Sequence, residues 1–303
     1  MGKSAKGLIF NSVHGSFVDG YGIRTTYFLK GCPLKCTWCC NPEGQSFRPE
    51  LKVSYDRCNG CERCIPVCPK KALSMRDGIV VVDRDACDGC MECLDVCYTD
   101  ALDVFGTWKT AEEVFKDVIK DEKYYATTGG GLTIGGGEAT CYPEFVMEMI
   151  ERCHENNISV AVDTCGFITE EENFKCLEAA DLILFDIKGL DAELHKRNTG
   201  QSNDVILNNL KRLNDLRKSI IIRLPLIPKY NDTLGRLEEV VDFLESLKSV
   251  ERIDILPMHE YGKIKYEQIG MPYRLQSETI SKERQKEILE LFRSRGLNAQ
   301  IGG

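Results

Sequence analysis

The sequence predicts an α/β protein built on a full or partial (β/α) barrel, with a cysteine-rich segment inserted near its start. Apolar segments of strand length alternate with stretches of helical apolar spacing, which indicates a parallel sheet. A helix after most strands suits a barrel, whose active site lies at the carboxyl ends of the strands. Eleven of the 16 cysteines fall into three closely spaced groups between residues 32 and 97. A doubly wound open sheet is the alternative fold.

The expected strands follow one another at 25–29, 131–134, 159–162, 182–187, 220–224, 252–256 and 298–301. Helical spacing without internal proline or glycine predicts helices at 236–247 and 279–293. Two further helix starts show the capping-box pattern, in which an N-cap threonine is followed three residues later by glutamate: Thr110 with Glu113, and Thr169 with Glu172. The carboxyl ends of the strands are the expected position of the active site.

Composition and charge favour a cytoplasmic globular protein. Of the 303 residues, 43% are hydrophobic and 28% charged, and no apolar run is long enough to cross a bilayer. The net charge of −8 disfavours a nucleic-acid-binding protein. The first residues lack the apolar core of a signal peptide, and Lys6 stands where a myristoylation site has serine or threonine. Closely spaced cysteines in so long a chain indicate metal ligation in a reducing cytoplasm rather than disulfides. Because oxygen destroys exposed clusters, an anaerobic host is expected.

The cysteine-rich segment contains an internal repeat. Residues 56–73 align with residues 85–102 at an offset of 29, and nine of the 18 positions are identical. Each copy has the four-cysteine spacing of bacterial two-cluster ferredoxins, in which the fourth cysteine of each run binds the other cluster. The expected ligand sets of the two [4Fe–4S] clusters are Cys58, Cys61, Cys64 and Cys97, and Cys87, Cys90, Cys93 and Cys68. In the alternative, each run closes on its own cluster.

A separate group of three cysteines, Cys32, Cys36 and Cys39, directly follows the first expected strand. Its spacing lets one short loop hold three corners of an iron–sulfur cube, which leaves one iron with an open position for a substrate. The alternative is a zinc site completed by Cys40. Adjacent cysteines rarely reach the same metal, so Cys40 is expected to be a free thiol.

The pattern Cys32-x3-Cys36-x-Trp38-Cys39 resembles the signature of radical S-adenosylmethionine (radical SAM) enzymes. The segments 19–24 (Asp-Gly-Tyr-Gly-Ile-Arg) and 41–44 (Asn-Pro-Glu-Gly) are similar to those of glycyl-radical enzyme activating enzymes. The eight-cysteine insert resembles the subgroup that carries two additional clusters. The resemblance runs from about residue 7 to the end of the chain. Departures from the family pattern are Tyr21 in place of proline, Cys40 in place of histidine and Ala139 in place of proline.

This resemblance implies a partial (β/α)6 barrel of the TIM type, as in radical SAM enzymes, with residues 1–47 and 105–303 as the core and 48–104 as a ferredoxin-like domain. It implies three [4Fe–4S] clusters, with Cys32, Cys36 and Cys39 as the catalytic set, and SAM as cosubstrate. One electron would cleave SAM into methionine and a 5′-deoxyadenosyl radical. That radical would take a hydrogen from a glycine Cα of a partner glycyl-radical enzyme. Ferredoxin or flavodoxin would supply the electron.

The resemblance also implies which residues bind SAM. Trp38 in the cysteine loop would be one of the residues that bind SAM. Gly136, Gly137 and Glu138 would hold the amino group of its methionine moiety. Their positions after a strand also fit a tight turn, in which glycine lets backbone approach closely.

Residues at the next strand ends complete the expected site. Lys188 would meet the SAM carboxylate, and Arg223 would serve the same anion or form a structural ion pair. His259 would contact the ribose or adenine, or be structural. Further polar residues, which would arrange SAM or a nearby monovalent cation or else cap ordinary surface turns, are Asp163, Thr164 and Asp186.

Several interpretations of the function remain open from the sequence. The insert either relays electrons or shapes the docking face for the partner. The whole chain could instead be a multi-cluster electron-transfer protein, a zinc-stabilised interaction protein, or a radical SAM enzyme acting on another peptide or small molecule. The segments 261–263 and 300–303 favour partners of the benzylsuccinate synthase or arylacetate decarboxylase groups.

Overall fold

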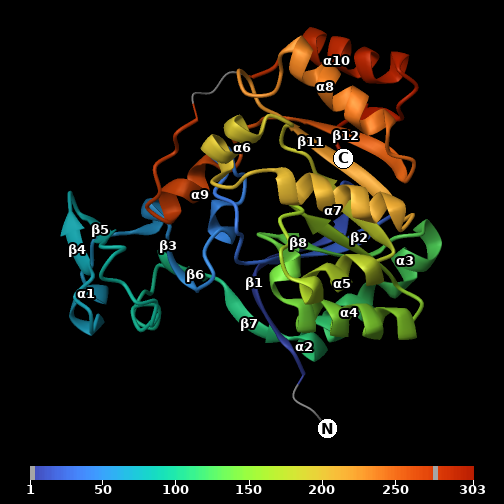
Figure 1. Cartoon of the computed structure of the whole chain (residues 1–303). Coiled ribbons are helices and arrows are strands. Elements are labelled where there is room, and N and C mark those ends of the chain that lie inside the picture. The colour runs from blue at the N-terminus through green and yellow to red at the C-terminus, as the bar shows by residue number, and fades with distance from the viewer. Residues whose placement is uncertain (1–3, 276–278) are drawn as a thin grey trace.

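The computed structural model describes residues 4–275 and 279–303, and its core is one nine-stranded sheet in the order β13-β12-β11-β10-β9-β8-β2-β1-β7 (Figure 1). The strands of this sheet are β1 Lys6–Ser16, β2 Arg24–Leu29, β7 Thr107–Thr110, β8 Gly131–Gly136, β9 Ser159–Thr164, β10 Leu182–Asp186, β11 Ile220–Leu226, β12 Val250–Pro257 and β13 Ala299–Ile301. The helices outside the insert are α2 Ala111–Val118, α3 Glu122–Thr128, α4 Pro143–Glu155, α5 Glu171–Ala179, α6 Ala192–Thr199, α7 Asp204–Asp215, α8 Leu234–Glu245, α9 Lys263–Gln268 and α10 Lys282–Ser294.

The strand order decides between the two fold classes. From β2 through β8 to β13, every neighbouring pair of strands is parallel, and the order never reverses. A doubly wound sheet reverses at its switch point, whereas an unreversed series of right-handed crossovers puts the connecting helices on one face. The sheet ends at β13 and β7 rather than closing. The predicted partial barrel is therefore confirmed, extended by β13 and by the antiparallel strands β1 and β7.

The two faces of the parallel strands differ in chemistry. The outward face packs with the helices in the large apolar core, whereas the inward face carries a small buried cluster of Ala161, Leu182, Leu184 and Ile221. Towards the carboxyl ends of the strands the inward positions become charged. Asp186 of β10 lies beside Arg223 of β11, which lies beside Asp254 of β12. The interior of the barrel is thus apolar in its middle and charged where the site is expected.

The cysteine-rich insert forms a small unit of its own. It contains β3 Glu50–Val53 paired with β6 Leu102–Phe105, the hairpin β4 Leu73–Arg76 with β5 Ile79–Val82, and the short helix α1 Cys64–Val67. Figure 1 shows β4, β5 and α1 at the edge of the molecule, with β3, β6 and α9 between them and the barrel. The chain re-enters the large sheet at β7, just after β6 ends. The domain boundaries after residues 47 and 104 stay predictions.

One of the two expected helix caps is wrong. The capping box of Thr110 and Glu113 is present at the start of α2. By contrast, α5 begins at Glu171, and its N-cap is Glu170, whose side chain makes no capping hydrogen bond. The preceding turn is held from outside, because Asn209 of α7 donates to the carbonyls of Gly166 and Ile168. The helix therefore starts one residue later than the capping pattern predicts.

No helix in the described part of the chain is long and apolar enough to span a membrane.

Candidate active site

The three-cysteine loop begins where β2 ends and is closed by its own backbone. Gly31 has φ +110°, a conformation that favours glycine, and its N–H donates to the carbonyl of Gly44 at 2.7 Å. Cys39 N–H donates to the carbonyl of Cys36 at 3.2 Å. From the other side, the last turn of α6 holds the loop, since Lys35 N–H donates to the carbonyl of Thr199 at 2.6 Å. These contacts position Cys32, Cys36 and Cys39 on one short turn.

The electrostatics of the three thiols fit an iron–sulfur cluster. Burial raises the pKa of Cys36 to about 12 and also raises the pKa of Cys39. A hydrogen bond with Cys165 lowers the pKa of Cys32. Cys32 raises the pKa of Cys36, and both raise the pKa of Cys39, so the three thiols interact electrostatically. Buried thiols that resist ionisation need a positive partner, and the iron of a cluster supplies that charge.

The Gly-Gly-Glu turn after β8 packs against this loop. Gly137 N–H donates to the carbonyl of Leu29, and Glu138 N–H donates to that of Gly31, both at 2.7 Å. A Cβ at Gly137 would lie 2.5 Å from the carbonyl oxygen of Gly44 and nearer still to that of Gly31. Gly136 has φ +111°. The glycines are therefore required for close approach to the protein's own backbone, whereas their contact with SAM stays a prediction.

Gly137→Ala is expected to weaken the cysteine loop. The added methyl group cannot fit between the carbonyls of Gly31 and Gly44, so the loop must shift. Overpacking of this kind costs about 1–3 kcal/mol of stability. Thermal unfolding would measure that cost, and iron analysis would show selective loss from the Cys32 loop. The control is Gly235→Ala in α8, where a Cβ meets no atom within 4 Å. An unaltered iron content in the Gly137 variant would contradict this expectation.

Glu138 is fully buried, and its carboxylate joins β8 to the end of β9. Its oxygens accept hydrogen bonds from the hydroxyl and N–H of Thr140, from the hydroxyl of Thr164 at 2.9 Å and from Cys165 N–H at 2.7 Å. These contacts make Glu138 and Thr164 positioning residues that hold two strand ends together. These hydrogen bonds explain the positions of Glu138 and Thr164 without direct contact of either side chain with SAM.

The charged strand ends form two close ion pairs. Arg223 Nη1 lies 2.9 Å from Asp163 Oδ2, and Lys188 Nζ lies 2.5 Å from Asp186 Oδ2. Burial raises the pKa of Asp163 to about 7 against the opposing effect of Arg223. Burial alone would lower the pKa of Lys188, but Asp186 together with Cys36 and Cys165 outweighs burial, so that pKa is raised. The structural ion pair expected as the alternative for Arg223 is therefore present, and the four side chains face one another.

The two aromatic candidates lie in different surroundings. The ring of Trp38 packs on Tyr230 with centroids 4.4 Å apart, and the buried hydroxyl of Tyr230 has no hydrogen-bond partner within the described residues. His259 is exposed and stacks on Tyr261 with centroids also 4.4 Å apart. The structure does not bring His259 into the group formed by Asp163, Asp186, Lys188 and Arg223, and its contact with SAM stays a prediction.

Two residues of the site escaped the sequence-based assignment. Asp19 lies near the ion pairs, with Oδ1 3.7 Å from Arg223 Nη1, and it accepts hydrogen bonds from Ser16 and Thr26. Its place in the segment 19–24 was the available signal. Cys165, a buried thiol outside the three cysteine groups, is hydrogen bonded to Cys32. No cysteine spacing could have indicated this, because Cys165 comes from a different strand end.

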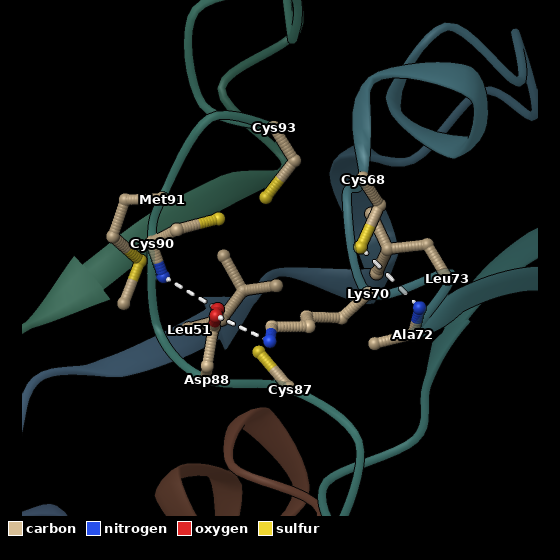
Figure 2. A pocket seen from close by; sticks show the side chains of 10 residues that line it. All are labelled: Leu51, Cys68, Lys70, Ala72, Leu73, Cys87, Asp88, Cys90, Met91 and Cys93. Atoms are coloured by element: carbon tan, nitrogen blue, oxygen red, sulfur yellow. Dashed lines mark hydrogen bonds and ion pairs between the residues drawn. The ribbon is translucent and has the colours of Figure 1, made fainter.

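The eight cysteines of the insert form two groups, each lining its own cavity. One cavity is lined by Cys58, Cys61, Cys64 and Cys97, and the other by Cys68, Cys87, Cys90 and Cys93. Figure 2 shows the sulfurs of the second group turned toward a common space. The cavity linings follow the predicted exchange of the fourth cysteine between the two runs, rather than the alternative in which each run closes on its own cluster. The ligand sets of the clusters stay a prediction.

Comparisons with known proteins agree with this site. The profile of the Radical SAM superfamily matches residues 88–246, that of a 4Fe-4S dicluster domain residues 50–98, and that of a 4Fe-4S single cluster domain residues 18–73. Among solved structures, a radical SAM methyltransferase from Sphaerobacter thermophilus has a TM-score of 0.53 at 14% identity, over 92% of this chain and 66% of that one. This likeness concerns the fold alone.

Among curated relatives, the trans-4-hydroxy-L-proline dehydratase activating enzyme of Clostridioides difficile is 40% identical over 98% of this chain and 99% of its own length. The choline trimethylamine-lyase activating enzyme of Oleidesulfovibrio alaskensis is 38% identical over 89% of each chain. The fold and the three-cysteine loop define a radical SAM oxidoreductase. Within that class, the chain belongs to the glycyl-radical enzyme activating enzymes.

Proposed function

We propose that this chain binds SAM between the Cys32 loop and the charged strand ends, and that a glycine loop of its partner enzyme reaches the same barrel mouth. The observation that carries this proposal is that three buried thiols, the Gly-Gly-Glu turn and two ion pairs meet at one end of the barrel. The cofactors are three [4Fe–4S] clusters, of which the Cys32 loop holds the one that supplies the electron for cleaving SAM. A monovalent cation would be held by Asp163 and Asp186.

The ion pairs have to exchange partners when SAM binds. Arg223 and Lys188 are the cations within reach of the site, and each is paired with a carboxylate. A SAM carboxylate would compete with Asp163 for Arg223 or with Asp186 for Lys188, which offsets the cost of removing the ligand from water. The carboxylates freed in this way are available to the SAM amino group or to the cation. The protein thus contributes orientation and exclusion of water, while the cofactor supplies the radical chemistry.

The identity of the partner enzyme is best tested directly. This chain is 40%, 37% and 35% identical to activators of hydroxyproline dehydratase, benzylsuccinate synthase and 4-hydroxyphenylacetate decarboxylase, respectively. These identities do not favour the benzylsuccinate or decarboxylase groups suggested by segments 261–263 and 300–303. We propose a hydroxyproline dehydratase-type partner as the first candidate. Reduced protein with SAM should generate a glycyl radical on the correct partner, visible by EPR. Release of 5′-deoxyadenosine without a radical on any glycyl-radical enzyme would instead support another peptide or small-molecule substrate.

We further propose that the insert relays electrons from a ferredoxin or flavodoxin in the cytoplasm. The double variant Cys61→Ala, Cys90→Ala should slow SAM cleavage driven by the protein reductant by about tenfold or more, since one ligand is lost from each insert cluster. Cleavage driven by dithionite should change little, because a small reductant can reach the Cys32 loop directly. Assays of 5′-deoxyadenosine release, quenched at fixed times, would measure both cleavage rates. Equal rates with the protein reductant would favour a purely structural insert.

A further inference from the structure

The two cysteine sites of the insert lie at different distances from the barrel. The site of Cys58, Cys61, Cys64 and Cys97 is also lined by Met75 and Val80 of the β4–β5 hairpin. Gly60, within this run, packs against Gly78 in the hairpin turn. Figure 1 shows that hairpin at the outer edge of the molecule. This site is therefore the outer one.

The second cysteine site lies beside the junction with the barrel. It is lined by Leu51 of β3 together with Cys68, Cys87, Cys90 and Cys93. Arg84, three residues before Cys87, donates to the carbonyl of Leu51 and, through Nη2 at 3.0 Å, to the carbonyl of Gln268 at the end of α9. In Figure 2 a helix in the colour of α9 lies beside Cys87. This site is therefore the inner one.

The other side of α9 contacts the Cys32 loop. Tyr266 donates its hydroxyl hydrogen to the carbonyl of Cys39 at 2.9 Å. Lys265 Nζ lies 2.7 Å from both Asn41 Oδ1 and Glu43 Oε1. The helix has only six residues, yet it touches the insert at one end and the loop of the catalytic cysteines along its length. It is a short bridge between the inner cysteine site and the active site.

A buried charge network fixes this junction. Lys30, fully buried at the end of β2, donates to the carbonyl of Glu43 and forms an ion pair with Glu50 at 2.5 Å, where the insert begins. Glu43 is 2% exposed and pairs with Lys265 of α9. Removing one partner of a buried pair leaves an uncompensated charge, which makes such a junction costly to break. Four segments of the chain are thus held in one geometry.

From these contacts we propose that the Cys68, Cys87, Cys90 and Cys93 site is the last to pass the electron to the Cys32 loop. We propose that Arg84, through its hydrogen bond to Gln268 of α9, positions this site for that step. The outer site precedes it. This order rests on the relay proposed above. A donor protein of low reduction potential loses one electron and is thereby oxidised. One electron arrives at the cluster of the Cys32 loop. No bond forms or breaks within the insert, and no proton needs to move.

The first test uses the reduced holoenzyme and its EPR spectrum. Two nearby reduced clusters broaden each other's signals, so the signal of the Cys32-loop cluster reports which insert site is its neighbour. The variant Cys87→Ala, Cys90→Ala removes the inner site and should abolish that broadening. The variant Cys58→Ala, Cys61→Ala removes the outer site and should leave it. If the broadening is lost only in the variant without the outer site, or is lost equally in both variants, the proposed order is wrong.

The second test keeps all the cysteines and changes only the bridge. Arg84→Gln should speed hydrogen exchange of residues 263–270 by about tenfold, since the hydrogen bond from a charged donor to Gln268 is lost. It should also slow reduction of the Cys32-loop cluster by the donor protein, with reduction by dithionite unchanged. The matched control is Lys52→Ala, whose ion pair with Asp103 lies within the insert. An unchanged reduction rate by the donor protein despite faster exchange would overturn the positioning role.

The two tests separate this proposal from the proposed function. Glycyl-radical formation driven by dithionite reports on SAM binding and on the partner enzyme, and it does not need the insert to relay electrons. If that reaction fails in the unmodified protein, the proposed function is wrong. If it succeeds and the EPR broadening follows the outer site, only the order of the two sites is wrong.

Discussion

Cys36→Ala is expected to abolish reductive SAM cleavage and glycyl-radical formation, by at least about 10³-fold, the scale on which loss of an essential catalytic group acts. Cys36 lies in the middle of the three-cysteine loop, and burial raises its pKa to about 12, so its thiolate is stable only when bound to metal. Release of 5′-deoxyadenosine and the EPR signal of the glycyl radical measure the effect. Iron content should fall by about one third, because the eight cysteines of the insert remain.

The control for this variant is Cys176→Ala. Cys176 is also fully buried, but it packs in the outer apolar core, where a small hydrophobe suffices. Its replacement should leave SAM cleavage and iron content unchanged. SAM cleavage by the Cys36 variant at the rate of the unmodified protein would show that the open cluster is not held at this loop.

Glu138→Gln is expected to lower the free energy of unfolding by about 2–4 kcal/mol, because an amide cannot replace a buried carboxylate that accepts several hydrogen bonds. The carboxylate accepts the N–H groups of Thr140 and Cys165, so an amide NH₂ placed there would face another donor. Glu138 N–H also donates to Gly31, beside the cysteine loop. Loss of cluster from the Cys32 loop should therefore accompany the lower stability.

Denaturant unfolding and iron analysis of the same samples would check this expectation. Glu151→Gln, an exposed change on α4, serves as the matched control and should shift stability by no more than about 0.5 kcal/mol. A Glu138 variant with unaltered stability but weaker SAM binding would contradict the positioning role and favour direct contact with SAM.

Much of the fold was predictable because its strands are local, apolar and buried. All seven expected strand segments overlap strands of the sheet, and their carboxyl ends carry the polar residues. The antiparallel strands β1, β7, β3 and β6 were not predicted, because each pairs with a segment distant in the sequence or follows no helix. The bridge helix α9 was also missed, since six residues are too few for a helical pattern to stand out.

How far the candidate site could be predicted differs among the cysteines, the strand-end residues and His259. The cysteine groups follow from spacing, because three ligands of each expected cluster lie on one short turn. The contacts of Glu138 and the pairing of Arg223 with Asp163 were not predictable in detail, since their partners come from neighbouring strands. For His259, the motif position alone suggested a ligand contact, whereas the structure places it on the surface against Tyr261.

By itself, the sequence determined the class of the protein, the three cysteine groups and the strands that carry the polar ends. These features depend on short-range spacing, and residues a few positions apart are constrained by local geometry. Only the tertiary structure decided why Gly137 must be glycine, which residues hold Glu138, and which insert site lies beside α9. Those answers depend on contacts between segments far apart in the chain, where packing and buried charge choose the partners.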